Sequence, residues 1–385
     1  MTDRVIILDR LARGETAAAL MVDGRLEDLL VDPPEAEPGP APGEIYWAKL
    51  DRPAGGGAFL RLTPDRTGWL REAKGLKPGQ GVLVQISAHA EPGKACPVTT
   101  RLLFKRRLVI HSPDAPGINP SRRIRDAGER ERLVAAAEAA LAAIPEPVSG
   151  GFILRSAAAG ADAAELAAEI AAALAEARAV REAATGPPPL RAPLSGPIGA
   201  AALALREWTD PLPDRFVIRR DGDALTSPTA MAAGSWPAGL GARLERAADP
   251  LETLEARAQI AALASPRVAL AGGATMFVEP TRACVAVDIN TGGDFSPAAG
   301  LKANIAALRE LPRQLRLRGL GGQIVIDPAP MLRRDRGRLD SVLKAALKRD
   351  PVETNMVGWT PMGLIELQRK RERRPLGDML SEDAR

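Results

Sequence analysis

The chain has 385 residues, enough for two or three domains that each bury a hydrophobic core, and it carries a formal net charge of +4 at pH 7. Its two cysteines, Cys96 and Cys284, stand far apart without a CxxC motif or a Cys/His cluster. We therefore expect neither a disulfide framework nor a cysteine-built zinc site, which fits a reducing, cytoplasmic setting. No run reaches the roughly 18 apolar residues that a membrane span needs, and the N-terminal run, broken by charges, predicts no signal peptide.

The basic residues are concentrated in one C-terminal region. Residues 313–374 hold 15 Lys and Arg against 7 Asp and Glu. Such a surface favours a polyanionic partner. The alternative is that these charges are merely solvated and that the abundance of Arg, Ala, Gly and Pro reflects a GC-rich genome. Charge alone does not separate the two interpretations.

The N-terminal part alternates short apolar runs with turns. Residues 4–10 and 15–32 predict strands around a turn at Asp23 and Gly24, and residues 32–43 form a Pro-rich connector. From Gly43 onward, five short apolar runs follow one another at close spacing, with Gly and Pro between them. This pattern predicts a small, closed or nearly closed β-barrel.

The middle of the chain is largely helical. A basic stretch leads into a predicted helix over residues 129–143, and a strand over 150–156 follows. Residues 161–184 are rich in Ala, Glu and Arg, which predicts a long helix, and the Pro-rich residues 185–197 end it. Residues 200–250 show short elements with Gly and Pro breaks and carry the least pattern.

A strand–helix–strand pattern occupies the C-terminal region. After a predicted helix and a hairpin around Gly272 and Gly273, one apolar strand ends at Asp288, a helix covers residues 298–317, and a second apolar strand ends at Asp327. A right-handed crossover makes two such strands parallel, so both aspartates should emerge at the same carboxyl edge of the sheet, where α/β proteins bind ligands. Pro312 predicts a kink or a short break in the crossover helix.

Two carboxylates at one edge repel each other unless a cation or a proton lies between them. Mg²⁺ prefers oxygen ligands, takes one or two carboxylates and completes its shell with water and phosphate, so it suits the pair and could assist phosphodiester hydrolysis. Asn290, on the same side of the strand as Asp288, could orient a water or a phosphate oxygen. An acid at a strand end can also simply cap a helix or a turn. The repeated ending and the basic surroundings favour the metal site.

The segment "CVAVDINTGGD…NIAALRELPRQLRLRGLGGQIVIDPAPM" resembles the catalytic segment of the ribonuclease E/G family, with its Asp-x-Asn strand, its "RQLRLR" helix end and its "IVID" strand. "GLIELQRKRER" resembles the closing helix of the same domain. "AALMVDGRLEDL" is similar to the family's opening hairpin, residues 43–105 to its S1-type RNA-binding barrel, and "SRRI" with "GFILRSA" to the flanks of its 5′-end sensor. The resemblance extends over nearly the whole chain and is weakest over residues 200–250.

The resemblance implies an α/β fold class with several subdomains. An RNase H-like subdomain with the 5′-sensor region would comprise residues 1–42 and 106–210. An S1-type (OB) β-barrel, residues 43–105, would be inserted into it. A DNase I-like α/β catalytic subdomain would comprise residues 211–385.

The resemblance also implies the catalytic residues. Asp288 and Asp327 match the magnesium-binding aspartates, so Mg²⁺ is the expected cofactor, and Asn290 matches the asparagine that helps orient the attack. The basic candidates for contacts with the RNA backbone are Arg316, Arg318 and Arg333. Basic side chains at a helix end are, however, commonly just solvated.

In the barrel, Phe59 and Trp69 fall on the two aromatic positions that hold a base near the cleavage site. Either ring can stack on any base. The alternative is that both rings belong to the barrel core. Lys94 matches a basic residue that lines the same channel.

The sensor residues are implied in the same way. Arg155 and Ser156 fall on the Arg-Thr pair that recognises a 5′-monophosphate, and both side chains suit phosphate oxygens. Arg122 and Arg123 belong to the same predicted pocket. The alternative for Arg155 is a surface ion pair.

The sequence departs from the family at three places. Glu353 stands where the family has an arginine that supports the 5′ pocket, and an acid there would repel phosphate, so we expect weak 5′-end sensing. Pro330 replaces an acid near Asp327, which predicts a different backbone after that residue. The family's cysteine-bearing zinc link has no match, so a zinc-linked dimer is not supported and a monomer or a differently built dimer is expected.

The expected function is a Mg²⁺-dependent endoribonuclease that cuts single-stranded RNA to leave a 5′-phosphate and a 3′-hydroxyl, acting in the processing and decay of rRNA precursors and mRNA. The alternative is an RNA-binding paralogue that has lost turnover and acts in RNA or ribosome assembly. A deoxyribonuclease is disfavoured, because an S1-type barrel suits single-stranded RNA.

Overall fold

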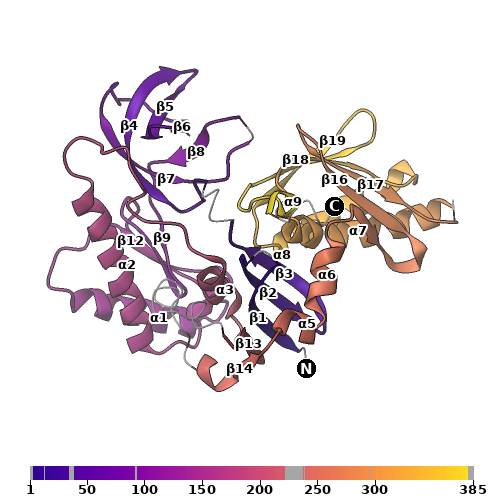
Figure 1. Cartoon of the computed structure of the whole chain (residues 1–385), viewed down its shortest axis with the longest axis horizontal. Coiled ribbons are helices and arrows are strands. Elements are labelled where there is room, and N and C mark those ends of the chain that lie inside the picture. Colours follow the sequence, from indigo (N-terminus) through magenta and orange to yellow (C-terminus); the bar gives the residue numbers. More distant parts are fainter. Residues whose placement is uncertain are drawn as a thin grey trace. The chain divides into compact units, whose positions relative to one another are not determined.

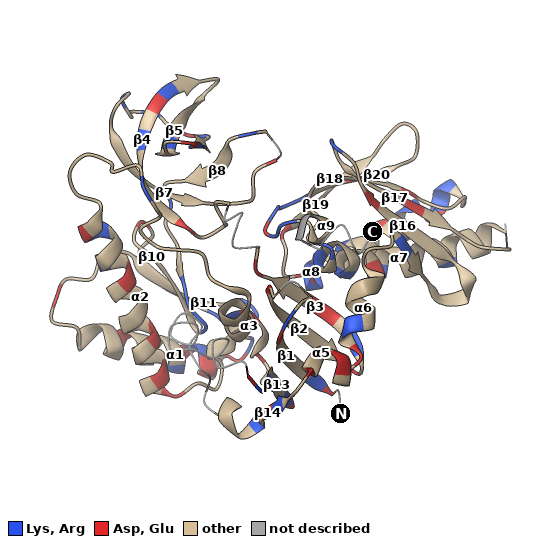
Figure 2. Cartoon of the chain, in the orientation of Figure 1, with Lys and Arg blue, Asp and Glu red and all other residues tan. Residues whose placement is uncertain are grey.

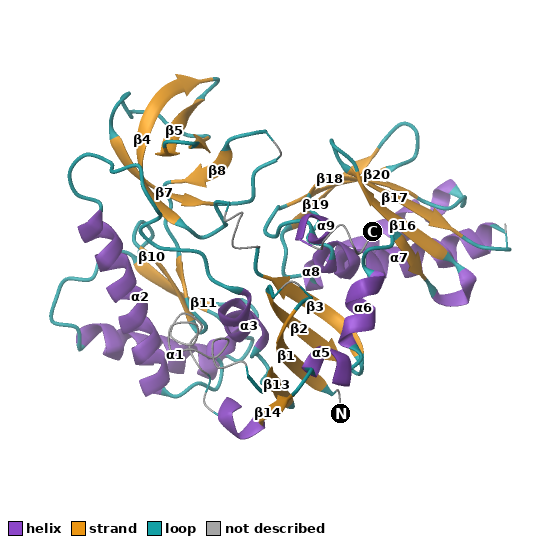
Figure 3. Ribbon diagram, viewed as in Figure 1, coloured by secondary structure: helices purple, strands orange, loops and turns teal. Residues whose placement is uncertain are grey.

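The computed structural model describes residues 3–12, 14–33, 39–91, 93–221, 237, 239–294 and 296–379. The chain divides into two compact units. Unit 1 comprises Met1–Ala18 and Asp32–Pro250, and unit 2 comprises Ala19–Val31 and Leu251–Arg385. Both units mix helices and strands, which confirms the predicted α/β class (Figures 1 and 3).

A closed five-stranded barrel lies in unit 1. Its strands follow one another around the barrel in the order β4-β5-β6-β8-β7, and their bounds are Ile45–Ala54 (β4), Gly57–Thr63 (β5), Arg66–Leu70 (β6), Gly81–Ile86 (β7) and Cys96–Thr99 (β8). Alternate residues of β5, such as Leu60 and Leu62, are buried inside the barrel with Val84. The closed barrel predicted to begin at Gly43 is thus confirmed.

The rest of unit 1 contains two groups of strands. Strand β1 (Arg4–Arg10) pairs in parallel with β13 (Arg215–Arg219), and β13 pairs in parallel with β14 (Leu244–Ala247). A second sheet has the order β11-β12-β10-β9, with bounds Phe104–Lys105 (β9), Val109–Ser112 (β10), Gly117–Pro120 (β11) and Gly151–Leu154 (β12).

Helices cover the second sheet. Helices α1 (Ala127–Ala142) and α2 (Ala163–Ala183) share one hydrophobic cluster with strands β10 and β12, and α3 (Ala200–Trp208) follows them in the chain. Asp126 and Asp162 cap α1 and α2 by accepting hydrogen bonds from the backbone N–H groups of the third helical residues. No described helix is long and apolar enough to cross a membrane.

A six-stranded sheet forms the centre of unit 2. Its order is β15-β16-β17-β18-β20-β19, with bounds Arg267–Ala269 (β15), Thr275–Pro280 (β16), Val285–Asn290 (β17), Gly322–Asp327 (β18), Thr354–Trp359 (β19) and Ile365–Arg369 (β20). Strands β17 and β18 are parallel, and the other neighbouring strands are antiparallel.

One face of this sheet is covered by helices α7 (Pro297–Leu317) and α8 (Arg336–Arg349), which contribute to one core with the strands (Figure 1). The other elements of unit 2 are the end of β2 (Thr16–Val22), β3 (Arg25–Val31), α6 (Ala256–Ala262) and α9 (Leu376–Met379). The short helix α5 (Pro250–Thr253) lies at the boundary of the two units. Along β17 and β18 the buried residues of the core alternate with exposed ones such as Asp288 and Asp327, which lie on the other face.

Two local predictions differ from the structure. The predicted closing helix over residues 363–373 is instead strand β20, because Ile365, Leu367 and Arg369 alternate with less buried residues at the period of a strand. Helix α7 runs through Pro312 without the short break that was one of the two expected outcomes, and the other, a kink, stays a prediction. Pro312 is buried, and it lacks the backbone N–H that other helix residues donate.

Candidate active site

Asp288 and Asp327 lie directly opposite each other on the parallel strands β17 and β18. Their strands run about 4.8 Å apart, and directly paired residues project from the same face of a sheet. Both side chains are exposed, whereas Val287 and Ile326, which precede them, are buried in the core. The predicted meeting of the two aspartates at one edge of the sheet is therefore confirmed.

Asn290 is bonded to the first of these carboxylates. Its Nδ2 donates a hydrogen bond of 2.7 Å to Asp288 Oδ2. The two side chains share a face because they are two residues apart on an extended strand. The amide thus orients the carboxylate, in addition to the role at water or phosphate that the sequence predicts.

The backbone after Asp327 is held by a buried side chain that the sequence analysis did not single out. Asn304, in the middle of α7 and fully buried, donates from Nδ2 to the carbonyl of Ala329 (2.9 Å) and accepts from the Ala329 N–H (2.8 Å). One turn earlier, a Cβ on Gly300 would lie 2.0 Å from the carbonyl oxygen of Pro330. The segment around Pro330 is therefore packed tightly against α7 and fixed by two hydrogen bonds.

A signal for Asn304 does exist in the sequence. It is the one amide among the small and apolar residues of "ANIAAL", on the face of α7 that is buried in the core. Buried amides nearly always find partners, so an Asn on an apolar helix face indicates a contact with a nearby backbone.

The loop between β17 and α7 has its own hydrogen bonds. Asp294 Oδ1 accepts from the backbone N–H of Ser296 (2.8 Å), and Ser296 Oγ caps α7 by accepting from the Ala299 N–H (3.2 Å). The hydrogen bond from Ser296 lowers the pKa of Asp294. Gly292, at φ +79°, packs so closely that a Cβ would lie 2.7 Å from the carbonyl oxygen of Gly273, before strand β16. The loop is thereby anchored at both of its ends.

The donor set fits a hard divalent cation of the Mg²⁺ type. Asp288 and Asp327 supply exposed carboxylate oxygens in register, and Mg²⁺ commonly binds through one or two carboxylates while water and phosphate fill its other positions. Within the described ranges, no group of three or more His, Cys, Asp or Glu side chains could hold a metal.

Two of the three basic candidates have a different environment from the one expected. The Arg316 side chain is only 7 % exposed, donating to Asp350 Oδ2 (2.9 Å) and to Glu27 Oε1 (2.6 Å). Arg318 is also buried, and it donates to Gln314 and to the carbonyl of Ser265. Both guanidiniums are used within unit 2, so these side chains hold the fold together rather than present charge to RNA.

Strand β3 carries acidic residues (Figure 2), which provide part of this pairing. Asp28 is buried and forms ion pairs with Arg316 (3.3 Å) and Arg373. Burial alone would raise the pKa of Asp28, but the charges of Arg373 and Arg316 outweigh it and hold the pKa below its ordinary value. Arg333, in contrast, is exposed in the short 3-10 turn Arg333–Asp335, six residues after Asp327, and remains a candidate for a contact with phosphate.

In the barrel, Phe59 and Trp69 form one aromatic pair on the outer surface. They lie opposite each other on β5 and β6, with ring centroids 4.9 Å apart and planes tilted by 58°. Both are only partly buried and lie outside the barrel core, so the alternative of two core residues does not hold. The guanidinium of Arg52 lies 5.1 Å from the centroid of the Phe59 ring.

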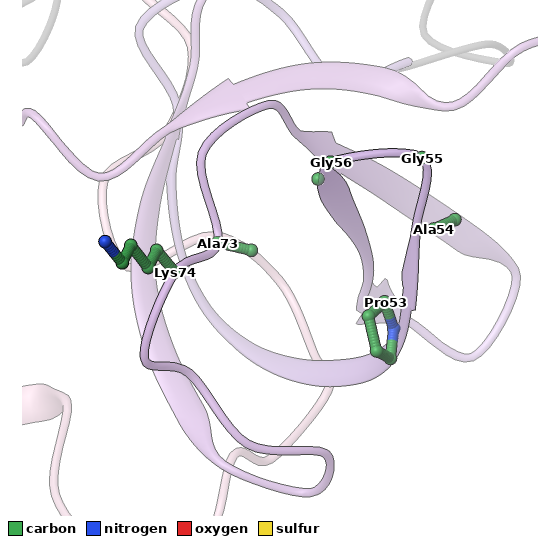
Figure 4. Close-up of a pocket in the computed structure, with 7 residues that line it drawn as sticks. Pro53, Ala54, Gly55, Gly56, Ala73 and Lys74 are labelled. Atoms are coloured by element: carbon green, nitrogen blue, oxygen red, sulfur yellow. The ribbon is translucent and has the colours of Figure 1, made fainter.

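A pocket of about 440 Å³ opens at the turn between β4 and β5 (Figure 4). It is lined by residues 53–57, Ala73 and Lys74. A Cβ on Gly57 would lie 2.7 Å from the Trp69 ring, so only glycine leaves room for this indole.

Lys94, in the loop before β8, is exposed and forms an ion pair with Glu91.

The predicted sensor residues lie together in unit 1. Arg155 and Ser156 directly follow strand β12, and Arg122 and Arg123 come one residue after β11, which pairs with β12. Arg122 and Arg123 are exposed, and Ser156 is partly buried.

Arg155 itself is engaged with protein groups. Its guanidinium donates to the carbonyl of Arg106 (2.7 Å) and forms an ion pair with Glu207. Burial alone would raise the pKa of Glu207, but the charges of Arg155 and Arg206 outweigh it and lower the pKa. A carboxylate thus already neutralises the guanidinium that would read a 5′-phosphate. Glu353, in unit 2, is exposed just before β19.

Comparisons with known proteins identify the family. The family model described as "Ribonuclease E/G family" matches residues 104–372. The chain is 30% identical over 317 residues to "Ribonuclease G" of Escherichia coli K12, an alignment that covers 80% of this chain and 63% of that protein.

Two further relatives extend the match. The chain is 29% identical to "Ribonuclease E" of Nostoc sp. over 363 residues, which cover 86% of this chain and 51% of that protein. It is 26% identical to "Ribonuclease G" of Haemophilus influenzae over 415 residues, covering 99% and 82%. The chain thus spans less than two thirds of the Escherichia coli relative and about half of the Nostoc one. The match over 104–372 contains Asp288, Asn290 and Asp327, and the chain belongs to the ribonuclease E/G family.

Proposed function

We propose that this protein is a Mg²⁺-dependent endoribonuclease that hydrolyses single-stranded RNA to leave a 5′-phosphate and a 3′-hydroxyl. The observation that carries the proposal is the direct pairing of two exposed aspartates, Asp288 and Asp327, with Asn290 bonded to the first of them. The names of the relatives, Ribonuclease G and Ribonuclease E, support the same activity.

The two carboxylates would hold the cation, and Asn290 would keep Asp288 in the orientation that presents its free oxygen outward. When bound, Mg²⁺ supplies electrostatic stabilisation of the negative charge that develops on the phosphate. A water oxygen forms the new bond to phosphorus, and the bond from phosphorus to the 3′-oxygen breaks. The water proton passes to solvent and the leaving 3′-oxygen takes up a proton, which gives the stated ends.

The barrel would hold the RNA. Phe59 and Trp69 offer stacking surfaces outside the barrel core, and Arg52 beside Phe59 adds a positive charge. Exposed Lys94 would contact the phosphate backbone, and Arg333 would do so near the aspartates. We further propose that the barrel subdomain comprises residues 43–105. It would be inserted into an RNase H-like subdomain, and a DNase I-like catalytic subdomain would follow.

The cellular substrates that this activity would suit are rRNA precursors and mRNA. We further propose that discrimination by the 5′ end is weak. Glu207 already pairs with Arg155, and Arg122, Arg123 and Ser156 would have to bind the phosphate largely without that guanidinium. RNA with a 5′-monophosphate and RNA with a 5′-hydroxyl should therefore be cleaved at similar rates.

The test uses a labelled single-stranded RNA and the matching DNA, each with Mg²⁺ or with EDTA. Wild type should cleave only the RNA and only with Mg²⁺, and mass spectrometry of the products should show 5′-phosphate and 3′-hydroxyl ends. Asp288→Asn and Asp327→Asn should each abolish cleavage, whereas Asp294→Asn should not, because Asp294 bonds only within its own loop in the described structure.

Cleavage that persists in both variants or in EDTA would refute the metal–carboxylate mechanism. Tight binding of RNA by wild type without any cleavage would instead favour an RNA-binding paralogue that has lost turnover. Cleavage of the DNA at the rate of the RNA would remove the assignment as a ribonuclease.

A further inference from the structure

The open face of the unit 2 sheet carries an aromatic side chain next to the paired aspartates. Phe277 lies directly opposite Asp288 across strands β16 and β17. Its neighbours along β16, Met276 and Val278, are buried in the core, so the alternation of the strand places Phe277 on the opposite, open face.

The row continues by one more strand. Arg267 on β15 lies directly opposite Phe277. Because directly paired residues share a face, Arg267, Phe277, Asp288 and Asp327 form one row across four neighbouring strands. With strands about 4.8 Å apart, Phe277 is one strand from Asp288 and Arg267 is about 10 Å from it.

Phe277 is unusual for this face. Its neighbours there are Thr275 and Glu279 along the strand and Arg267 and Asp288 across it. Phe277 is the one aromatic residue on this face of the six described strands, since Trp359 packs against the core on the other face. A ring that is only partly buried among polar and charged groups retains a free surface on which another planar group can lie.

Arg267 is exposed, and its guanidinium forms no ion pair with any other described residue. Its backbone N–H is bonded to Ser265 Oγ (3.2 Å), which fixes the start of β15. The turn between β15 and β16 is held by the loop that follows Asn290, because Gly292 packs on Gly273. The spacing of the row is therefore set by sheet register and by this contact.

We propose that Phe277 and Arg267 form a nucleotide subsite next to the paired aspartates, in which the Phe277 ring stacks on a base flanking the scissile phosphate and Arg267 binds the next phosphate of the same single strand. The inference rests on the proposed function for the identity of the strand as RNA. Each nucleotide of such a strand carries one planar base and one anionic phosphate. The Phe277 ring suits the base, and the neighbouring Arg267 guanidinium suits the phosphate. A duplex would not expose a base to the ring.

The first experiment measures stacking without cleavage. Asp327→Asn protein is titrated with single-stranded RNAs that carry 2-aminopurine at each position around the cleavage site. Stacking on Phe277 should quench the fluorescence at one flanking position. In the Asp327→Asn, Phe277→Leu double variant this quenching should be lost, whereas Phe277→Trp should restore it.

The second experiment measures turnover and salt dependence. Phe277→Leu should lower kcat/KM for RNA cleavage by about 5- to 150-fold, the range expected for loss of one stacked base. Arg267→Gln should reduce the slope of log affinity against log salt concentration by about 0.7, as expected for one lost phosphate contact on a single strand, and Arg267→Lys should retain the slope.

Matched controls come from the same unit. Val357→Ala removes a 67 % exposed apolar side chain from edge strand β19 and should leave quenching and turnover unchanged. Arg309→Gln removes an exposed charge from helix α7, which covers the opposite face, and should leave the salt slope unchanged.

The outcomes separate this subsite from the proposed function. Cleavage by wild type together with equal quenching in wild-type and Phe277→Leu backgrounds overturns the subsite alone. Quenching that depends on Phe277, without cleavage by wild type, supports the subsite and refutes the nuclease activity. Quenching that is lost instead in Trp69→Leu places the stacked base on the barrel and also overturns the subsite.

Discussion

The side chain of Asn304 forms hydrogen bonds with both the N–H and the carbonyl of Ala329, which lies two residues after Asp327. Asn304 is fully buried in α7, so these two bonds connect the crossover helix to the loop that follows the second aspartate. Its two hydrogen bonds fix the path of the segment around Pro330.

Asn304→Ala should therefore destabilise the protein and impair the site together. Removing the amide leaves the buried N–H and carbonyl of Ala329 unpaired, which costs about 2–5 kcal/mol in free energy of unfolding. Urea unfolding measures the loss, and the Mg²⁺ concentration that gives half-maximal cleavage should rise. Asn355→Ala, at an exposed position of β19, is the control and should change neither quantity by much.

Two glycines in neighbouring helices should respond in opposite directions to alanine. A Cβ on Gly300 would lie 2.0 Å from the Pro330 carbonyl oxygen, whereas a Cβ on Gly337 in α8 would meet open space. Gly300→Ala should lower the melting temperature and kcat, because the loop after Asp327 must move. Gly337→Ala should raise stability by roughly 0.4–1 kcal/mol, since alanine favours the helix. Equal effects of both changes would contradict the close packing at Gly300.

Arg316 and Arg333 should differ in what their loss affects. Arg316→Met removes one of the two arginine partners of Asp350 and of Asp28, which keep Arg369 and Arg373, so the free energy of unfolding should fall by about 1–3 kcal/mol. Arg333→Gln should leave stability unchanged but weaken RNA binding and reduce its salt slope by about 0.7. Thermal unfolding and RNA titrations at several salt concentrations measure the two effects. A large drop in stability for Arg333→Gln would show instead that the Arg333 side chain stabilises the fold.

Glu207 should make stability depend on pH in the acid range. Its pKa in the folded protein lies below its ordinary value of 4.5, so its ion pairs with Arg155 and Arg206 stabilise the fold above that pH. As the pH falls from about 4.5 through the lower folded pKa, this contribution is lost. Glu207→Gln should flatten the dependence of unfolding free energy on pH in that window, measured by urea unfolding. A profile identical to wild type would show that the pair contributes nothing.

The same variant tests the sensor. With Glu207 neutralised, Arg155 can bind an external anion more readily, so Glu207→Gln should raise the preference for 5′-monophosphorylated over 5′-hydroxylated RNA. Arg155→Gln in the same background should remove that gain.

Features set by local pattern could be predicted from the sequence. The close spacing of apolar runs and Gly turns predicts the barrel, and the apolar runs that end at Asp288 and Asp327 predict the parallel pair. Both depend on the two-residue period of strands and on the handedness of crossovers, which act over short stretches of chain.

Features set by distant partners could not be predicted in this way. The partners of Arg316 include Glu27 and Asp28, almost 290 residues earlier, so a helix end rich in arginine looks solvated when it is in fact buried. The segment 363–373 was expected to be a helix from its resemblance to the family's closing helix, but pairing with β18 and β19 makes Ile365–Arg369 a strand. A lone Phe in a strand ordinarily indicates a core residue. Only the register of the sheet shows that Phe277 lies opposite Asp288 on the open face.

The in-register pairing of β17 and β18 has a consequence for how this protein tolerates mutation. A slip of β18 by one residue would turn Asp327 inward and Ile326 outward, so the apolar residues beneath the sheet, such as Ile324 and Val285, decide the spacing of the two carboxylates. The packing of the core thus sets the geometry of the carboxylates at the surface. Substitutions among those aliphatic side chains should abolish activity while every polar residue at the site remains intact. Inactive natural variants are therefore expected at these core positions as well as at the aspartates.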